Sequence, residues 1–414
     1  MKLNRFLFGC IIGLLVMCII FSGLLLKDAL RDKNSAEDTL IAVPTTEASA
    51  DTTEEPTREA VGPDSGVESI SVAIYPFLPD LDLAQNILAQ MWAEMEPDVE
   101  LEFVYWDCYV DPSPHGIDVL VYDAATMDYL VKNDLILPVN LESLEDTSDI
   151  LPFAMDGARY NGALYGLPVM VCSYFLIHYT EDEEMVNVQD FEDLCNLLSE
   201  RKGWYASDGL QIDYWDGLPY FYLEALMDYT GTYSNFKRTP DVNPPDEILM
   251  ARLHEIYSIV PEPADYIWAW NYQSRFAQGE GSACYSYSEA LSYMTDILDQ
   301  LTIRPIPFFK GDNVLIYYAD VASIGSHVKD PVKKAVCEKL INLMASPEYQ
   351  AQLCYGSGAV QYLLPAREQV YITAMEQYPM YETLHKLATN ENNRIFRFGS
   401  DLFDYSELAY EVMG

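Results

Sequence analysis

The chain has 414 residues, half of them hydrophobic, so it can bury at least one large core. Its 24 basic and 65 acidic residues give a formal net charge of -41, which repels phosphate backbones and anionic lipid headgroups and attracts cations. This balance argues against nucleic-acid binding. The 31 tyrosines favour a small organic cation as ligand, because aromatic rings attract cations, although tyrosines more often simply pack.

The first segment of the chain is apolar. Residues 6–26 carry no charge and are long enough to span a bilayer as a helix. A cleavable signal has a shorter apolar region and a small-residue cleavage site, and no such site follows residue 26. We therefore expect residues 1–33 to form a signal-anchor, with a cleaved signal segment as the alternative. Basic residues lie on both sides, so the positive-inside rule does not set its orientation.

A polar linker follows the apolar segment. Residues 34–66 consist mainly of Thr, Ser, Ala, Pro and Glu and contain almost no aromatic residues. Such a segment cannot bury enough apolar surface to offset the entropy of ordering it. We expect a disordered acidic tether between the membrane segment and the folded domain.

The ordered region begins with strands that alternate with helices. Residues 69–77, 98–106 and 116–122 read as strands, the last of them almost continuously apolar, as in a strand covered on both faces. Residues 80–95 and 125–132 read as helices. This order predicts an α/β fold with an open, mostly parallel sheet.

Aromatic and acidic residues follow each of these strands. Tyr75 and Phe77 follow the first, Asp107 and Tyr109 the second, and Asp123 the third. Each aspartate alone is explained by turn chemistry. Ligands of open α/β sheets, however, bind beyond the carboxyl ends of the strands. Three consecutive strand ends of this kind therefore predict a pocket for a cation.

An apolar, β-rich run at residues 166–178 carries a single thiol, Cys172, near its centre. A free cysteine is among the most buried residue types and usually only packs. The alternative is a placed nucleophile, which requires a base and a substrate pocket elsewhere in the chain. The residues of this run leave both interpretations open.

The remaining cysteines and the histidines do not form a metal-binding pattern. No cysteine pair has Cys-x-x-Cys spacing, and His254-Glu255 lacks the second histidine of a zinc-protease helix, so no metal site is predicted. An exported chain can contain one or two disulfides. The sequence leaves the redox state of five cysteines open: Cys108, Cys195, Cys284, Cys337 and Cys354.

The second half of the chain continues the mixed pattern. Two glycine pairs, at residues 279–281 and 356–358, match neither a dinucleotide-binding turn nor a phosphate-binding loop. We expect further helices and strands in the following ranges: helices at 188–199, 218–229, 246–259 and 330–345, and strands at 301–307 and 314–323.

Several short motifs in this order resemble those of a known enzyme family. They are Ala73-Ile74-Tyr75-Pro76, Trp106-Asp107-Cys108-Tyr109, Leu151-Pro152-Phe153-Ala154, Tyr165-Gly166-Leu167-Pro168, Phe276-Ala277-Gln278-Gly279, Tyr287-Ser288-Glu289, Leu363-Leu364-Pro365-Ala366-Arg367 and Asn393-Arg394 with Phe396-Arg397. From about residue 67 to the C-terminus, the chain is similar to thiaminase I, also called thiamine pyridinylase.

The resemblance implies the two-lobed fold of type II periplasmic binding proteins, with a central cleft. In that fold residues 67–414 form one domain, in which the chain crosses between the lobes near residues 166–174, near 300–320 and near the Leu363-Leu364-Pro365 motif. Lobe I then consists of about residues 67–170 plus 310–365, and lobe II of about residues 171–309 plus 366–414.

The resemblance also implies an activity and a set of site residues. The family replaces the thiazolium ring of thiamine with a nucleophilic acceptor, such as pyridine, an aromatic amine or a thiol, and needs no cofactor. By this resemblance Cys172 is the nucleophile that adds to the pyrimidine, and Glu289 is its general base. The implied substrate-binding residues are Tyr75, Phe77, Tyr109, Asp123, Trp270, Tyr287, Tyr318 and Asp320. Phe77 and Trp270 stand where the family has tyrosines.

The required chemistry sets a condition on Glu289. Reference pKa values of about 8.5 for Cys and about 4.3 for Glu leave a glutamate too weak a base by roughly 4 units, or about 5.7 kcal/mol. A cleft of low dielectric closes part of this gap by raising the carboxyl pKa. A non-catalytic extracellular binding protein for thiamine or a related pyrimidine is the alternative, because a binder needs neither Cys172 nor Glu289. Either protein is expected to be a monomer whose only membrane contact is the N-terminal segment.

Overall fold

The structure is a computed structural model of the whole chain. It describes residues 66–111, 113–140, 144–201, 205–206, 224–225, 228, 247–248, 251, 272–308, 313–356 and 360–397. The predicted membrane segment and nearly all of the predicted linker lie outside these ranges. Within them, no helix combines the length and the apolar character that a membrane span needs.

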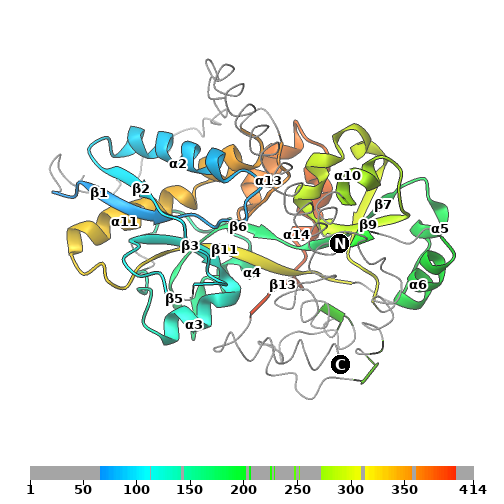
Figure 1. Cartoon of the computed structure of the whole chain (residues 1–414), viewed down its shortest axis with the longest axis horizontal. Coiled ribbons are helices and arrows are strands. Elements are labelled where there is room, and N and C mark those ends of the chain that lie inside the picture. The colour runs from blue at the N-terminus through cyan, green and yellow to red at the C-terminus, as the bar shows by residue number, and fades with distance from the viewer. Residues whose placement is uncertain are drawn as a thin grey trace, which may run out of the picture. The chain divides into compact units, whose positions relative to one another are not determined.

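The larger of the two main sheets has seven strands (Figure 1). Their order is β12-β6-β11-β3-β1-β2, with β13 pairing with β11. The strands are β1 (Ser69–Ala73), β2 (Glu100–Phe103), β3 (Val119–Asp123), β6 (Gly166–Cys172), β11 (Ile316–Ile324), β12 (Leu364–Pro365) and β13 (Arg394–Ile395).

The prediction of a mostly parallel sheet was wrong for half of its pairings. β1 pairs in parallel with β2 and β3, and β11 with β13. By contrast, β11 runs antiparallel to both β3 and β6, and β12 antiparallel to β6. The expectation came from the β-α-β order of the first third of the chain. The antiparallel strands come from segments much later in the sequence, whose direction a local pattern does not reveal.

Helices cover this sheet, and several of them begin at a side-chain cap. The helices include α2 (Leu81–Met95), η1 (Ala124–Thr126), α3 (Met127–Lys132), α4 (Pro152–Gly157), α11 (Pro331–Met344), α12 (Pro347–Ala351), η7 (Gln352–Gly356), α13 (Glu368–Met375) and α14 (Met380–Ala388). The Asp80 carboxylate accepts from the third residue of α2, and Asp330 caps α11 through two backbone N–H groups. Pro331 occupies the first position of α11, where its missing N–H is not needed.

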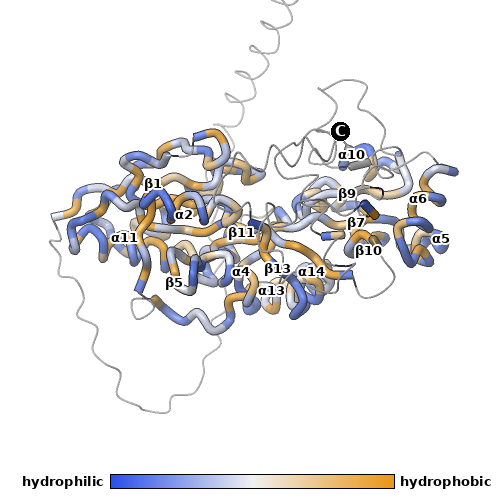
Figure 2. Tube along the Cα trace, turned by 90° about the horizontal axis from the view of Figure 1, so that it is seen from below, coloured by the Kyte–Doolittle hydropathy of each residue, from blue (hydrophilic) through white to orange (hydrophobic). Residues whose placement is uncertain are grey.

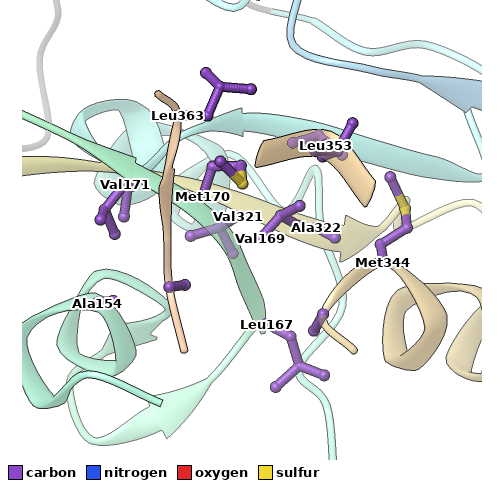
Figure 3. Close-up of a cluster of buried hydrophobic side chains, with 14 of the residues drawn as sticks. Ala154, Leu167, Val169, Met170, Val171, Val321, Ala322, Met344, Leu353 and Leu363 are labelled. Carbon is purple, nitrogen blue, oxygen red and sulfur yellow. The ribbon is translucent and has the colours of Figure 1, made fainter. Parts of the chain in front are cut away.

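Strand β6 lies at the centre of the core (Figure 3). Its first six residues are all buried, as expected of a strand covered on both faces. Ala154 of α4 and Met344 of α11 lie on opposite sides of β6 in Figure 3. In Figure 2 the central strand β11 is largely hydrophobic, whereas α5 (Glu183–Val186) and α6 (Phe191–Ser199) contain hydrophilic stretches. This packing fixes the backbone on which Cys172 lies.

A second sheet of four strands follows directly from the first. Its order is β10-β7-β9-β8, formed by β7 (Tyr174–Tyr179), β8 (Tyr205–Ala206), β9 (Ala283–Tyr287) and β10 (Leu301–Arg304). Only Ser173 separates β6 from β7, so the chain passes from one sheet to the other within one residue. The Ser173 hydroxyl donates to the carbonyl of Ile316 in β11, which ties this crossing point to the larger sheet.

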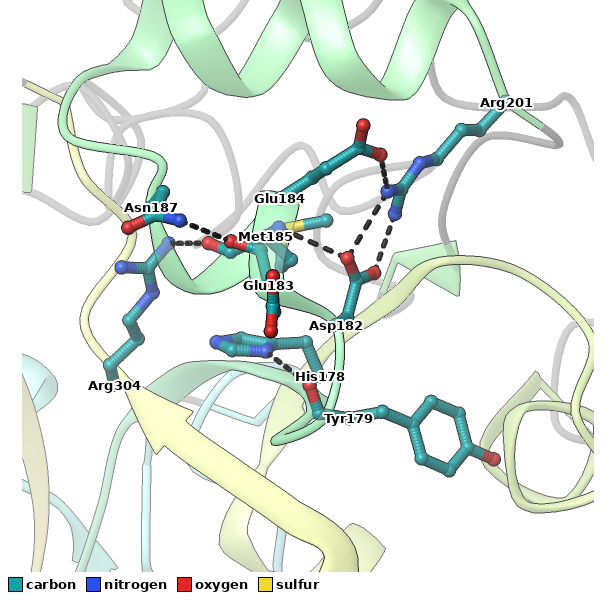
Figure 4. Close-up of polar contacts among 9 residues, drawn as sticks. All are labelled: His178, Tyr179, Asp182, Glu183, Glu184, Met185, Asn187, Arg201 and Arg304. Atoms are coloured by element: carbon teal, nitrogen blue, oxygen red, sulfur yellow. Dashed lines mark hydrogen bonds and ion pairs between the residues drawn. The ribbon is translucent and has the colours of Figure 1, made fainter.

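The remaining short elements connect and cover the sheets. They are the small hairpin of β4 (Arg159–Tyr160) and β5 (Ala163–Leu164), α10 (Tyr272–Ala277), η5 (Ser288–Tyr293) and η6 (Thr295–Gln300). Near α5, Arg201 forms ion pairs with Asp182 and Glu184 (Figure 4). Arg304 donates to two backbone carbonyls at and just beyond the end of α5. The buried His178 ring contacts the Tyr179 carbonyl through Nδ1. These contacts hold the edge of the second sheet.

The structure confirms most of the predicted elements, with ends that differ by a few residues. The predicted strand at residues 69–77 ends at Ala73, because the residues that follow turn away from the ladder. Strand β9 was not predicted. The predicted helices at 218–229 and 246–259 fall almost entirely outside the described residues. No disulfide joins the six cysteines within the described residues.

Candidate active site

Three positions in otherwise buried strands keep partial exposure to solvent. Cys172 is the last residue of β6, Tyr287 is the last residue of β9, and Asp320 is the single partly exposed residue of β11. Glu289, two residues after β9, is also partly exposed as a residue, although protein atoms surround its carboxyl group and desolvate it. All four were predicted as site residues. A core strand gains nothing by exposing a thiol or a carboxyl group, so these side chains mark an accessible surface within the fold.

The register of β11 brings four of the predicted residues onto one face of the larger sheet. Tyr318 pairs with Cys172 of β6, and Asp320 pairs with Asp123 of β3. Directly opposed residues project to the same face, and so do residues two apart on one strand. Cys172, Tyr318, Asp320 and Asp123 therefore share this face. A register irregularity in the β6–β11 pairing lies immediately after Asp320.

The register of the second sheet relates Cys172 to Glu289. Tyr174 of β7 pairs with Tyr287 of β9 in an antiparallel ladder. In such a ladder one step along a strand is matched by one step back along its partner. Cys172 lies two residues before Tyr174, and Glu289 lies two residues after Tyr287, so both residues lie beyond the same end of this ladder. They are 117 positions apart in sequence, and the pairing of β7 with β9 brings their segments to the same end of the second sheet.

Aromatic side chains connect the ends of β1 and β2 to Asp123. The rings of Tyr75 and Phe77 meet edge to face at a centroid distance of 5.4 Å, and Phe77 lies 6.1 Å from Tyr109. The Tyr109 hydroxyl donates to the Asp123 carboxylate at 2.5 Å. Phe77 is 58% exposed, whereas Asp123 is buried. The predicted convergence of strand ends is confirmed, and it forms an aromatic path from the surface to a buried carboxylate.

The carboxyl groups of this surface have raised pKa values. Burial raises the pKa of Asp123 to about 6, although hydrogen bonds from Tyr109 and the Ala125 backbone favour its ionised form. Burial, followed by the negative charges of Asp123 and Glu289, raises the pKa of Asp320 well above its usual range. The paired aspartates therefore disfavour double ionisation, and a cation bound beside them would relieve that cost.

Glu289 has the pKa that the proposed chemistry requires. Burial raises the pKa of its carboxyl group to about 7, against which its own backbone N–H and the Ser288 hydroxyl act weakly. This rise closes most of the gap of roughly 4 units between the reference pKa values of cysteine and glutamate. Since Glu289 also raises the pKa of Asp320, its carboxyl group lies within electrostatic reach of the aspartate pair.

The structure does not show two of the predicted substrate-binding residues at the accessible surface. Trp270 lies outside the described residues. Tyr318 is 3% exposed, and its ring packs against Phe396 at 5.0 Å. Asp107, which follows the second predicted strand, accepts from the Tyr109 backbone N–H, so its carboxylate shapes a turn. Within the described ranges, no three His, Cys, Asp or Glu side chains are arranged to hold a metal ion.

Sequence reasoning missed four side chains around the site. Cys108 is buried, and its pKa is raised by burial and then by the charge of Asp123. Tyr174 and Tyr285 stack beside Tyr287, and Glu224 accepts a hydrogen bond from Tyr285. A local signal existed only for Tyr174, which lies two residues after Cys172. Glu224 has no local signal, because its contact comes from a strand 61 residues away in sequence.

This fold and its site are those of a solute-binding protein. Residues 111–384 match the family described as bacterial extracellular solute-binding protein, and the chain belongs to that family. The likeness extends to solved structures with far lower sequence identity. One of them is a maltose-bound protein of T. maritima, at 14% identity and a TM-score of 0.61 over 83% of this chain and 99% of the other, a level that shows the fold alone.

A closer relationship is also present. The chain is 33% identical over 359 residues to Thiaminase-1 of Paenibacillus thiaminolyticus, covering 83% of this chain and 87% of the relative. The structure of thiaminase I from Bacillus thiaminolyticus matches with a TM-score of 0.74 at 31% identity, over 84% of this chain and all of the other. Clostridium botulinum thiaminase I in complex with thiamin matches with a TM-score of 0.74 at 27% identity, over 83% and 100%. The chain belongs to the thiaminase I family.

Proposed function

We propose that this protein is a thiamine pyridinylase, a transferase that exchanges the thiazole of thiamine for another nucleophile. The observation that carries the proposal is that Cys172 and Glu289, both partly exposed, lie beyond the same end of the ladder between β7 and β9. The relatives named thiaminase, one of them solved with thiamin bound, support the same reaction and substrate.

The proposed reaction begins at the thiol. The Glu289 carboxylate accepts the proton of Cys172, and the thiolate forms a bond to a carbon of the pyrimidine ring. The bond between the methylene carbon and the thiazolium nitrogen then breaks, and the thiazole leaves with the electron pair, as a neutral ring. An acceptor forms a new bond to the methylene carbon; a primary or secondary amine or a thiol then loses a proton to solvent, whereas pyridine has no such proton and gives a pyridinium product. The bond between the Cys172 sulfur and the pyrimidine then breaks, and the thiolate takes back the proton from Glu289, which restores the free enzyme.

The surroundings suit a cationic substrate. Asp123 and Asp320 form a cross-strand pair of carboxyl groups, beside which an aminopyrimidine in its protonated, more electrophilic form is favoured. Ring faces such as those of Tyr75 and Tyr109 attract the thiazolium, with about 0.5–2 kcal/mol for each such contact. The net charge of -41 attracts the cation from a distance.

The alternative is a binding protein for thiamine or a related pyrimidine that does not react. The solute-binding fold favours it, because most of the pocket would serve either role. A protein that only binds thiamine, however, does not need a carboxyl group with a pKa of about 7 beyond the same end of a ladder as an accessible thiol. That feature favours the enzyme.

One assay separates the two functions. Purified protein is mixed with thiamine and pyridine, and the free thiazole is measured by chromatography beside thiamine binding by calorimetry. We expect thiazole release that depends on pyridine, with the pyridine-substituted pyrimidine formed in equal amount. Binding of thiamine without release of thiazole would support the solute-binding alternative and contradict the enzyme.

The organisation of the chain extends the proposal. We place the catalytic domain at the extracellular face, in agreement with the solute-binding family, and held there by residues 6–26 as an anchor. The membership of β7 to β10 in a separate sheet supports a second lobe that begins near residue 171 and returns near residue 310. We propose that the domain acts as a monomer, because the site draws its residues from a single chain.

A further inference from the structure

A buried carboxyl group that the proposed reaction does not use lies next to the second sheet. Glu224 is a helical residue whose side chain is 1% exposed. Its Oε2 accepts a hydrogen bond from the Tyr285 hydroxyl at 3.3 Å. Glutamates are almost never fully buried unless they are paired, because burial of an unpaired carboxylate costs several kcal/mol. The hydrogen bond from Tyr285 is one such pairing, and it ties Glu224 to strand β9 of the second sheet.

A stack of three phenols leads from Glu224 to a predicted substrate-binding residue. The Tyr285 ring lies parallel to the Tyr174 ring, with 5.2 Å between centroids and an interplanar angle of 3°. Tyr174 lies 4.1 Å from Tyr287, whose hydroxyl donates to the Tyr174 hydroxyl at 2.5 Å. Since Tyr174 and Tyr285 are both fully buried, neither ring has room to reorient independently.

A buried phenol, Tyr317, lies within electrostatic reach of both Glu224 and the proposed nucleophile. The hydroxyl of Tyr317 is buried, and it has no hydrogen-bond partner among the described residues. Burial raises the pKa of Tyr317 above its usual range, and the charges of Glu224 and Cys172 raise it further. The carboxyl group and the thiol therefore both lie within electrostatic reach of the same phenol.

We infer that Glu224 is a positioning residue for the reaction proposed above: it holds Tyr287, and through it Glu289, at the end of the β7–β9 ladder beyond which Cys172 also lies. The inference rests on the proposed function. Glu224 fixes Tyr285 by a hydrogen bond, Tyr285 fixes Tyr174 by stacking, and Tyr174 fixes Tyr287 by a second hydrogen bond.

The backbone explains why Tyr287 is the sensitive point. Tyr287 is the last residue of β9, and η5 begins at Ser288 without a side-chain cap. Its extended backbone, with φ of -65° and ψ of 162°, sets the direction in which the chain leaves the ladder. Glu289 is the second residue after this point. A ring displaced at Tyr287 therefore moves the general base away from the thiol, and small displacements reduce rates strongly.

The test is a double-mutant cycle on thiazole release. The variants are Tyr285→Phe, which removes only the hydroxyl, Glu224→Ala, and the two combined. We expect each single variant to lower kcat about tenfold, the effect of one lost hydrogen bond, and the double variant to lose no more than the worse single one. Glu224→Gln retains an acceptor oxygen and is expected to keep at least about half of wild-type kcat.

Two further measurements separate positioning from stability. Thermal unfolding reports the folded fraction at the assay temperature, and kcat is expressed per folded molecule. Thiamine affinity, measured by calorimetry, is expected to stay within about threefold of wild type, because binding needs less exact alignment than proton transfer.

Tyr371→Phe is the matched control: it removes a buried hydroxyl that has no hydrogen-bond partner within the described residues, so kcat is expected not to change.

Each outcome has one meaning. Independent losses that multiply in the double variant, or wild-type kcat per folded molecule in Tyr285→Phe, would overturn the positioning role. If Glu224→Ala does not fold, Tyr285→Phe and Glu224→Gln still decide it. If the wild-type protein itself releases no thiazole, the proposed function fails first, and the positioning role fails with it.

Discussion

At the scale of single residues, the burial of Glu289 changes what its carboxyl group can do. A carboxyl pKa of about 7 reduces its gap from the reference cysteine value of about 8.5 to roughly 1.5 units, or about 2 kcal/mol. The original gap of about 4 units would have made proton transfer from a thiol costly. In exchange, the folded state is less stable, because folding must remove the Glu289 carboxylate from water.

The first prediction concerns the nucleophile. Cys172→Ser replaces the thiol with a hydroxyl whose proton a carboxylate cannot readily remove, so thiazole release is expected to fall at least about 1,000-fold. Thiamine affinity, measured by calorimetry, is expected to stay within about threefold. Cys195→Ala, in α6, is the control and should keep full activity. Normal thiazole release by Cys172→Ser would refute the assignment.

The second prediction concerns the base. Glu289 acts as a base only when ionised, and its raised pKa means that the ionised form predominates above about pH 7. We expect kcat/KM of the wild type to rise with pH between about 6 and 8. Glu289→Gln should lose about 100-fold or more at pH 8 and should lack this rise. A variant that kept both the rate and the rise would show that another group is the base.

The local sequence predicted many of the site residues but not their pKa values. Cys172 could be predicted because it lies within an apolar run, and the residues after the first three strands because they follow such runs. Glu224 was not, because its significance depends on a contact with a strand far along the chain. Asp107 looked equivalent to Asp123, and both carboxylates accept from the backbone N–H two residues further on. Only the structure shows that Asp123 also accepts from the Tyr109 hydroxyl.

At the scale of elements, the site depends on two strand pairings that meet at Ser173. β6 is fixed against β11, and β7 against β9, so Cys172 is aligned by one ladder and Glu289 by the other. The apolar runs of these strands were readable from the sequence. Their pairing was not, since a period of two residues gives the faces of a strand but not its partner.

The third prediction tests the first of these pairings. Gly166 begins β6, and a Cβ there would lie 2.2 Å from the Ala322 carbonyl oxygen and 2.5 Å from the Ser323 hydroxyl. Gly166→Ala must therefore push β6 away from β11. We expect the free energy of unfolding to fall by about 1–3 kcal/mol or more, and kcat to fall with it, because Cys172 ends the same strand.

A second buried glycine provides the control. At Gly157 a Cβ would meet only side-chain atoms, each at 3.3 Å, which can move by a few tenths of an ångström. Gly157→Ala is expected to destabilise the protein less than Gly166→Ala in urea unfolding. Equal losses of stability, or a Gly166→Ala variant with wild-type stability and kcat, would contradict the dependence on the β6–β11 contact.

At the scale of the whole molecule, four carboxyl groups with raised pKa values predict the dependence of stability on pH. The pKa is about 6 for Asp123, about 7 for Glu289 and about 8 for Asp228, and the pKa of Asp320 lies well above its usual range; burial is the main cause in each case. Their unfolded values lie near 4, so these groups bind more protons in the folded state across this range. The lowered pKa of the buried His178 has the opposite effect below about pH 6.5, but it is one group against four. Linkage then predicts that stability falls as pH rises from about 5 to 8.

The fourth prediction follows from this sign. Urea unfolding should give a larger free energy of unfolding at pH 5 than at pH 8. Asp118 and Asp182, whose pKa values are lowered, act only below about pH 4 and leave this window unchanged. Asp228→Asn should reduce the difference between the two pH values. Stability that is equal at both, or greater at pH 8, would contradict the assignment of buried neutral carboxyl groups.

The fifth prediction concerns the net charge of -41. Salt screens charges over about 30 Å at 0.01 M but over only a few ångströms near 1 M. We expect kcat/KM for thiamine, a cation, to fall between 10 and 500 mM NaCl, while kcat stays constant. The KM for pyridine, neutral at pH 8, serves as the control and should not change. Equal salt effects on both substrates would exclude electrostatic attraction as the cause.

The position of Cys172 and Glu289 beyond the same end of the β7–β9 ladder has a consequence for protein engineering. Residues that enter one strand and leave its antiparallel partner at the same end come to the same edge of the sheet, and ligands of open α/β sheets bind beyond the ends of strands. Here a thiol lies two residues before one strand, and a carboxyl group lies two residues after the other. To acquire this chemistry, a receptor with the same scaffold thus needs a thiol and a carboxyl group at such positions, in a pocket that raises the pKa of the carboxyl group. It does not need a new backbone. Installing this pair in a solute-binding protein would measure how much of the catalysis comes from alignment alone.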